Sequence, residues 1–215
     1  HPGGGSGGGI YITCQAFWGN AGGQLRVNGG LGYITGSSGG GGRIALLYDG
    51  AAQAALGRPG VRFAAAPGNY FIYPYSPLEH PGTVYFPDTL LLGEVLASQQ
   101  FARVRLMGVT NWAPGSLTVS NCEVTLGETN FDLAVTNDLR VDLGGSLALA
   151  TGGWVRCGGN ALLTNAGNDV DILSALLTGA TLSRLDYNDF DGLALDMVPA
   201  ITTSLGALST AATDV

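Results

Sequence analysis

The sequence predicts an all-β protein, a right-handed parallel β-helix in which short strands stack coil upon coil. Two observations favour this solenoid: glycine runs alternate with short strand sequences in the first third, and short apolar segments recur at regular intervals in the second half. A β-sandwich is the alternative, since evenly spaced strands also fit two packed sheets. Strands of only three to five residues favour the solenoid.

The composition excludes several function classes. The chain has 215 residues with 9 basic and 16 acidic side chains, a net charge of -7, and arginine as its only basic residue besides histidine. Nucleic-acid binding is excluded, because neutralising phosphates needs clustered basic residues. With 46% hydrophobic and 12% charged residues the chain should fold rather than stay disordered. No apolar run approaches the roughly 18 to 20 residues that span a bilayer.

Residues 1–50 are expected to form glycine-rich β-helix coils. Half of the 36 glycines lie here, in runs that alternate with strand sequences such as Ile10-Tyr11-Ile12-Thr13. The block from Ser6 to Ile12 returns loosely as Gly40 to Leu46, and a flexible linker would not repeat a strand after each run. We therefore expect ordered repeats, with the glycines turning the chain tightly between strands.

Residues 51–115 are expected to form a less regular, Pro- and Tyr-rich segment packed on the solenoid. Four aromatic residues crowd six positions, and the surrounding prolines place them in a loop or at a sheet edge. The structural interpretation is a loop that covers apolar surface. The functional interpretation is an exposed aromatic platform for a glycan or a partner chain. The platform residues are Tyr70, Phe71, Tyr73 and Tyr75.

Residues 116–173 show the clearest repeat and are expected to form regular coils. Short apolar segments are centred at 118, 125, 134, 140, 148, 155, 162 and 171, and turn residues separate them. Three strands a coil give about 22 residues per coil, so the segments near 118, 140 and 162 should stack. Alternation points one set of side chains inward and the other outward. The expected inward residues are Leu117, Val119, Leu139, Val141 and Leu162; Thr118, Arg140 and either Leu163 or Ala161 should point outward.

Residues 174–215 lose the strand pattern and are expected to form a cap or an extended tail, since a solenoid end otherwise exposes an apolar face. This tail is acidic, and Asp and Asn oxygens alternate ahead of Gly192 much as in calcium loops. Their register is imperfect, so a solvated surface turn is the alternative to a calcium site. The candidate ligands are Asp186, Asn188, Asp189, Asp191 and Asp196.

The cysteines and histidines give weaker signals. Cys14, Cys122 and Cys157 lack zinc-site spacing and are expected to be small core residues; a disulfide that is intermolecular or includes Cys14 is the alternative. His1 and His80 resemble, as two residues only, the copper-binding brace of lytic polysaccharide monooxygenases. Those enzymes are built on an immunoglobulin-like sandwich, so the resemblance stops at a candidate copper pair.

No catalytic residues are predicted, and the chain is not expected to be an enzyme. The glycine runs lack the Lys-Ser/Thr of a phosphate-binding loop, and no nucleophile elbow occurs. A carboxylate pair or an Arg base on an outer face is the polysaccharide-active alternative. Its candidates, Asp132, Asp138, Asp142 and Arg140, are scattered, which favours a solvated face.

The order of motifs resembles the large glycine-rich β-helix surface proteins of environmental bacteria, which are adhesin-like or autotransporter-passenger-like. The resemblance rests on Ser-Gly-Gly-Gly-Ile-Tyr-Ile at 6–12, Gly-Gly-Gly-Gly-Arg-Ile-Ala-Leu at 39–46 and Ser-Leu-Thr-Val at 116–119. Leu-Arg-Val-Asn-Gly-Gly at 25–30 and Pro-Gly-Thr-Val-Tyr at 81–85 lie between them. The resemblance implies an extracellular or cell-surface location and supplies no catalytic residues.

These expectations combine into a structural or adhesive extracellular protein. Open coil edges of a β-helix can pair with the next molecule by strand addition, so the expected partners are copies of the chain itself, joined head to tail into a filament. A carbohydrate-binding or carbohydrate-active module with a polysaccharide partner is the alternative. No cofactor is expected apart from the candidate calcium.

Overall fold

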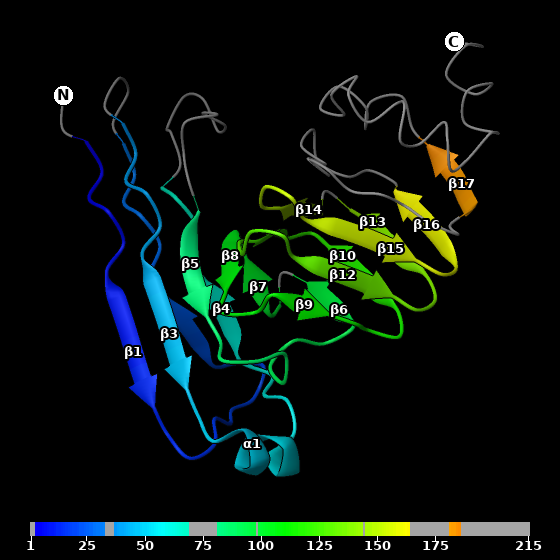
Figure 1. Ribbon diagram of the computed structural model, residues 1–215. Coiled ribbons are helices and arrows are strands. Elements are labelled where there is room, and N and C mark those ends of the chain that lie inside the picture. The colour runs from blue at the N-terminus through cyan, green and yellow to red at the C-terminus, as the bar shows by residue number, and fades with distance from the viewer. Residues whose placement is uncertain are drawn as a thin grey trace. The chain divides into compact units, whose positions relative to one another are not determined.

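The computed structural model describes residues 3–32, 37–68, 81–97, 99–143, 145–163 and 181–185, and these residues are almost entirely β (Figure 1). They belong to two compact units. The first comprises the described residues of His1–Leu92, Ala97–Val109 and Cys122–Val124. The second comprises those of Gly93–Leu96, Thr110–Asn121 and Thr125–Val215.

The first unit contains two parallel sheets. In one the strand order is β1-β3-β5-β8, followed by Glu123 and Val124 of β11; in the other it is β2-β4-β7. The first sheet consists of β1 (Gly9–Thr13), β3 (Arg43–Leu47), β5 (Gly82–Tyr85), β8 (Val104–Met107) and β11 (Glu123–Leu126). The second consists of β2 (Gln24–Arg26), β4 (Arg62–Ala64) and β7 (Phe101–Ala102).

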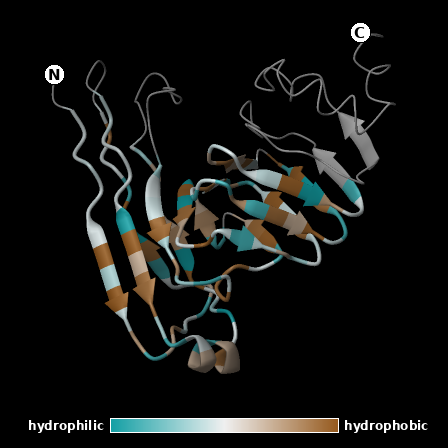
Figure 2. Cartoon of the chain, in the orientation of Figure 1, coloured by the Kyte–Doolittle hydropathy of each residue, from teal (hydrophilic) through white to brown (hydrophobic). Residues whose placement is uncertain are grey.

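Strand alternation builds the core of this unit. Ile10 pairs with Ile44, Ile44 with Val84 and Val84 with Leu106, so one aliphatic row crosses four strands. Figure 2 shows these hydrophobic residues recurring along β1 and β3. Phe63 of β4 lies fully buried, with its ring centroid 5.3 Å from Phe86 and 5.7 Å from Phe101. Inward alternate residues of each short strand therefore supply the apolar core.

A short helix, α1 (Gly50–Leu56), follows β3 and was not expected from the sequence. Four alanines favour a helix, and the side chain of Asp49 caps it by accepting a hydrogen bond from the Ala52 amide at 2.8 Å. Gly57 ends it with a φ of 84°, a conformation that glycine adopts without strain.

The glycine runs are ordered, but they do not serve as turns. The Gly4 and Gly7 amides donate to the carbonyls of Ser37 and Gly40, and the Gly42 amide donates to Val27. The donors Gly4 and Gly7 are three residues apart, and so are their acceptors Ser37 and Gly40. This interval matches the three-residue period of a polyproline II helix rather than the two-residue period of a β-strand. Among the described glycines, positive φ occurs at Gly57, Gly108 and Gly152, outside these runs.

Close approach of neighbouring backbones explains why these positions are glycine. A Cβ on Gly7 would lie 2.1 Å from the carbonyl oxygen of Val27, and one on Gly42 would lie 2.0 Å from that of Gly8. Gly5 and Gly8 would meet nothing within 4 Å. The expected tight turns are therefore corrected, at these described glycines, to laterally packed, extended backbone.

The second unit contains the regular repeat. Two of its sheets have the strand orders β17-β16-β13-β10-β6 and β15-β12-β9, and β14 pairs with β11 as the last strand of the sheet that begins with β1. The first consists of β6 (Val95–Ala97), β10 (Leu117–Ser120), β13 (Leu139–Asp142), β16 (Asn160–Leu163) and β17 (Thr181–Leu185). The others contain β9 (Asn111–Trp112), β12 (Asp132–Val135), β15 (Trp154–Cys157) and β14 (Ser146–Leu149).

The 22-residue step predicted from the sequence is confirmed. Leu117 pairs in parallel with Leu139 and Leu139 with Ala161, while Asp132 pairs with Trp154 in a second sheet. The four inward residues expected on β10 and β13 are buried, whereas Thr118 is half-buried and Arg140 exposed. The eighth predicted segment, near 171, lies outside the described residues.

The backbone register of β16 differs from the expected one. Leu162 pairs with Arg140, whereas Ala161 and Leu163 pair with Leu139 and Val141. The 22-residue step therefore aligns Ala161, rather than the larger Leu162, with Leu117 and Leu139. In the part of the chain that the structure describes, no helix is long and apolar enough to cross a membrane.

Candidate functional site

The site residues predicted from the sequence lie outside the described residues. This holds for the aromatic platform, the candidate calcium ligands and the candidate copper pair. They are Tyr70, Phe71, Tyr73 and Tyr75; Asp186, Asn188, Asp189, Asp191 and Asp196; and His1 and His80. Among the residues that are described, no group of three or more His, Cys, Asp or Glu side chains is placed to hold a metal.

None of the three cysteines forms a disulfide with another, and two of them are core residues. Cys122 and Cys157 are buried, as expected, and Cys14 is half-buried. The thiol of Cys157 donates to the carbonyl oxygen of Asn137 at 3.1 Å. A small thiol at the end of β15 therefore satisfies a carbonyl of the turn that precedes β13.

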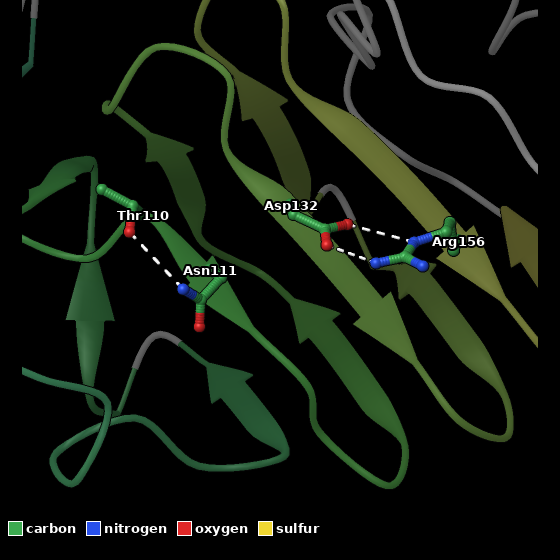
Figure 3. A network of polar contacts seen from close by, with 4 residues as sticks. All are labelled: Thr110, Asn111, Asp132 and Arg156. Carbon is green, nitrogen blue, oxygen red and sulfur yellow. Dashed lines mark hydrogen bonds and ion pairs between the residues drawn. The ribbon is translucent and has the colours of Figure 1, made fainter.

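Figure 3 shows the polar network on the sheet that contains β9, β12 and β15. The Arg156 guanidinium binds both carboxylate oxygens of Asp132, with Nε donating to Oδ1 at 3.1 Å. Asn111, which pairs with Asp132 across the ladder, donates its amide to the Thr110 hydroxyl at 3.5 Å. Because Asp132 is already bound by a guanidinium on the next strand, it serves as a cross-strand contact rather than as a free acid or base.

The other acidic candidates also have structural partners. Asp138 accepts a hydrogen bond from the Asn160 amide at 2.8 Å, which links the start of β16 to the start of β13. Asp142 accepts from Nε of Arg140 at 2.5 Å. Asp142 is only 5% exposed, so the expectation of a solvated face is wrong for this residue. It ends β13, and its backbone carbonyl accepts from the Gly145 amide at 2.8 Å.

A half-buried tyrosine and an aspartate form a separate polar pair in the first unit. The Tyr48 hydroxyl donates to Oδ1 of Asp88 at 2.6 Å, and the Leu90 amide donates to the same oxygen. Burial, and then the bond to the Asp88 carboxylate, raise the pKa of Tyr48 well above its usual 10.0. The phenol stays protonated at physiological pH and holds the segment after β5 to the end of β3.

The open edge of β1 is the first candidate interaction surface. Ile44 and Leu46 of β3 are buried, whereas their register partners Ile10 and Ile12 of β1 are only half-buried. In β2, Leu25 is likewise half-buried, whereas its partner Phe63 is fully buried. Within the described residues no strand pairs with the far side of β1 or β2, so both present half-covered apolar side chains and a free strand edge.

The outward face of the β1-β3-β5-β8 sheet is the second candidate surface. Tyr11 is 71% exposed and Tyr85 is 38% exposed, and both pair with Ala45 of the strand between them. The sequence carries a signal for this face, namely the alternation of residues along the two strands. In Ile-Tyr-Ile and Thr-Val-Tyr, alternation already turns each tyrosine away from the core.

Comparison with protein-family models, with curated proteins and with solved structures found no match to this chain. The function is therefore argued from the chain's own geometry. The two surfaces that offer unsatisfied contacts are the open edge of β1 and β2 and the outward tyrosine face.

Proposed function

We propose that this chain is a structural or adhesive extracellular protein, built as a right-handed parallel β-helix and joined head to tail into filaments. The open edge of β1 and β2 is the observation that carries the proposal. The β-helix is supported by parallel registers that step by 22 residues in four strand pairs: Gly82 to Val104, Leu117 to Leu139, Leu139 to Ala161 and Asp132 to Trp154.

The occupant of the open edge is a coil from a second copy. Inside the chain, β3 covers β1 by stacking Ile44 on Ile10 and Leu46 on Ile12. The far side of β1 offers the same half-buried isoleucines and the same unpaired backbone groups to whatever approaches from outside. A stack of like coils thus presents at its end the kind of surface that it buries between its own coils. Contacts of this kind are heterologous and grow into filaments when they do not close.

The glycine-rich segments suit such a role. Their backbones pack directly against one another and bond between segments, as in the bond from the Gly39 amide to the Gly30 carbonyl at 3.0 Å. A protein stabilised largely by stacked main-chain hydrogen bonds, with few charges, is suited to durable material outside the cell. Catalytic chemistry has no comparable support, because the described acidic candidates are held by structural partners.

Electron microscopy of negatively stained protein at rising concentration tests the proposal. Wild-type protein should form filaments of uniform width, and a double variant with Ile10→Asp and Ile12→Asp should stay monomeric, since charges at the edge resist strand addition. Leu143→Asp, at an exposed apolar side chain that follows β13 in the second unit, is a control for added charge and should still form filaments. Wild-type protein that stays monomeric at all concentrations would contradict the filament proposal.

A further inference from the structure

The outward face of the β1-β3-β5-β8 sheet carries two registered rows of side chains. One row is apolar and aromatic, and the neighbouring row is polar and basic. The first consists of Tyr11, Ala45, Tyr85 and Met107, and the second of Gly9, Arg43, Thr83 and Arg105. Both rows belong to one unit and come from four strands that are far apart in the sequence.

The two tyrosines lie on either side of Ala45. They stand two strands apart, about 9.5 Å between their Cα atoms at the usual strand spacing. The ring of Tyr85 packs against Gly108, where a Cβ would lie 2.6 Å from Cε2 of the ring. Glycine at 108 therefore lets the ring lie close to the backbone that follows β8, which restricts the position of the ring.

The two arginines make the same face basic. Arg43 and Arg105 are exposed and also stand two strands apart, on either side of Thr83. Three other arginines, Arg103, Arg140 and Arg156, pair with carboxylates, but these two have no acidic partner among the described residues. Two guanidinium groups that lack an acidic partner in the described part of the chain give this face a local positive charge, although the net charge of the chain is -7.

We infer that this face binds an acidic polysaccharide, a polymer of uronic acid type. The C–H faces of its sugar rings would stack on Tyr11 and Tyr85, because the negative face of an aromatic ring attracts polarised C–H groups. Its carboxylates would pair with Arg43 and Arg105. The spacing supports a polymeric ligand. The two tyrosines are two strands apart, and so are the two arginines, so the face presents its aromatic and its charged groups at the same interval.

An acidic polysaccharide fits better than nucleic acid or a second copy of the chain. A nucleic acid carries one phosphate per nucleotide, and its charge density requires more basic groups than two arginines in an acidic protein. A second copy would need exposed apolar surface larger than two separated tyrosines to bind stably. This inference deepens the adhesive part of the proposed function and does not depend on filament formation.

Titration calorimetry with polygalacturonate tests the inference. Wild-type protein should bind this polymer, should lose most of the affinity for its methyl ester, in which the carboxylates are neutral, and should bind more weakly at high salt. Arg43→Gln and Arg105→Gln should each weaken binding several-fold, and Tyr11→Ala and Tyr85→Ala should each weaken it about tenfold. A melting curve for each variant shows whether it is folded.

Two matched controls isolate the face. Arg26→Gln removes the same charge from an exposed position on β2, and Trp18→Ala removes an exposed aromatic ring from a loop. Both should bind as wild type does. Equal binding to the methyl ester, equal losses in the control variants, or tighter binding to single-stranded poly(dT) than to polygalacturonate would overturn the inference. Binding that persists in the variant with Ile10→Asp and Ile12→Asp would support this face even if no filaments form.

Discussion

The Gly7 amide donates a hydrogen bond to the carbonyl oxygen of Gly40 at 2.9 Å, and a Cβ on Gly7 would lie 2.4 Å from the amide nitrogen of Gly42. The glycine-rich segments are thus packed backbone to backbone, at distances that leave no room for a side chain. Glycine is therefore required where a Cβ would clash with a neighbouring backbone, as at Gly7 and Gly42. It is not required where a Cβ would meet nothing, as at Gly5 and Gly8.

Gly7→Ala should destabilise the protein, and Gly8→Ala should not. The new methyl group on residue 7 must displace backbone atoms of two neighbouring segments, which costs about 1 to 3 kcal/mol or more. At residue 8 it meets nothing within 4 Å, and the lower entropy of the unfolded chain would then stabilise by up to about 1 kcal/mol. Denaturant unfolding of the two variants measures the difference. Equal midpoints would show that the segments are not packed in this way.

Gln53→Ala should cost about 2 to 4 kcal/mol, because it leaves buried backbone groups without partners. The Gln53 side chain is fully buried, accepts from the Phe17 amide at 2.7 Å and donates to the carbonyl oxygens of Phe17 and Gly57. Its hydrogen bonds thereby hold α1 against the segment that follows β1. Gln15→Ala, at an exposed side chain, should change the free energy of unfolding by less than about 0.5 kcal/mol. Similar effects of both substitutions would contradict this role.

Tyr48→Phe should destabilise at pH 8, and the difference from wild type should shrink as the pH rises above 10. The raised pKa means that folded protein keeps the phenol proton after the unfolded chain, with a pKa near 10.0, has lost it. The stabilisation by Tyr48 is therefore complete below pH 10 and is lost at higher pH. Phe cannot titrate and lacks the bond to Asp88, which contributes about 1 to 2 kcal/mol.

Urea unfolding across this pH range measures the Tyr48 effect. Tyr11→Phe, at an exposed tyrosine, is the control and should leave the free energy of unfolding at pH 8 unchanged. A gap between wild type and Tyr48→Phe that stays constant from pH 8 to pH 11 would show that Tyr48 is not the linked group.

The ion pair in Figure 3 should contribute little to stability. Asp132 and Arg156 are 41% and 53% exposed, so solvent screens their attraction, and Asp132→Asn should cost less than about 1 kcal/mol. Leu133→Ala, at the buried neighbouring position, should cost about 2 to 5 kcal/mol. Thermal unfolding of both variants compares the contribution of the ion pair to stability with that of the buried leucine. An effect of Asp132→Asn as large as that of Leu133→Ala would mean that the polar pair organises the sheet.

The regular strand repeat of the second unit could be predicted from the sequence because its period is visible in it. Leu117, Leu139 and Ala161 are separated by equal steps, and turn residues separate the strands, so the parallel pairing followed. In the first unit the steps are unequal: Ile10 pairs with Ile44, Ile44 with Val84, and Val84 with Leu106. No single repeat length is therefore visible there, and β4 and β7 are only three and two residues long.

The interaction surfaces were harder to predict, since they depend on contacts across the stack. Alternation alone could have placed Tyr11 and Tyr85 outward, but only the register shows that both flank Ala45. The half-burial of Ile10 cannot be read from its neighbours in the chain, because Ile10 and Ile44 occupy equivalent repeats. The glycine runs were misassigned to turns because sequence does not distinguish glycine needed for positive φ from glycine needed for close approach.

Amide hydrogen exchange of β1 at low and high protein concentration tests the central claim most directly, since the claim is that this edge pairs with a second copy. The account predicts that protection of Gly9–Thr13 rises with concentration, while that of Arg43–Leu47, already paired on both sides, stays the same. Protection of β1 that is equal at every concentration would contradict it.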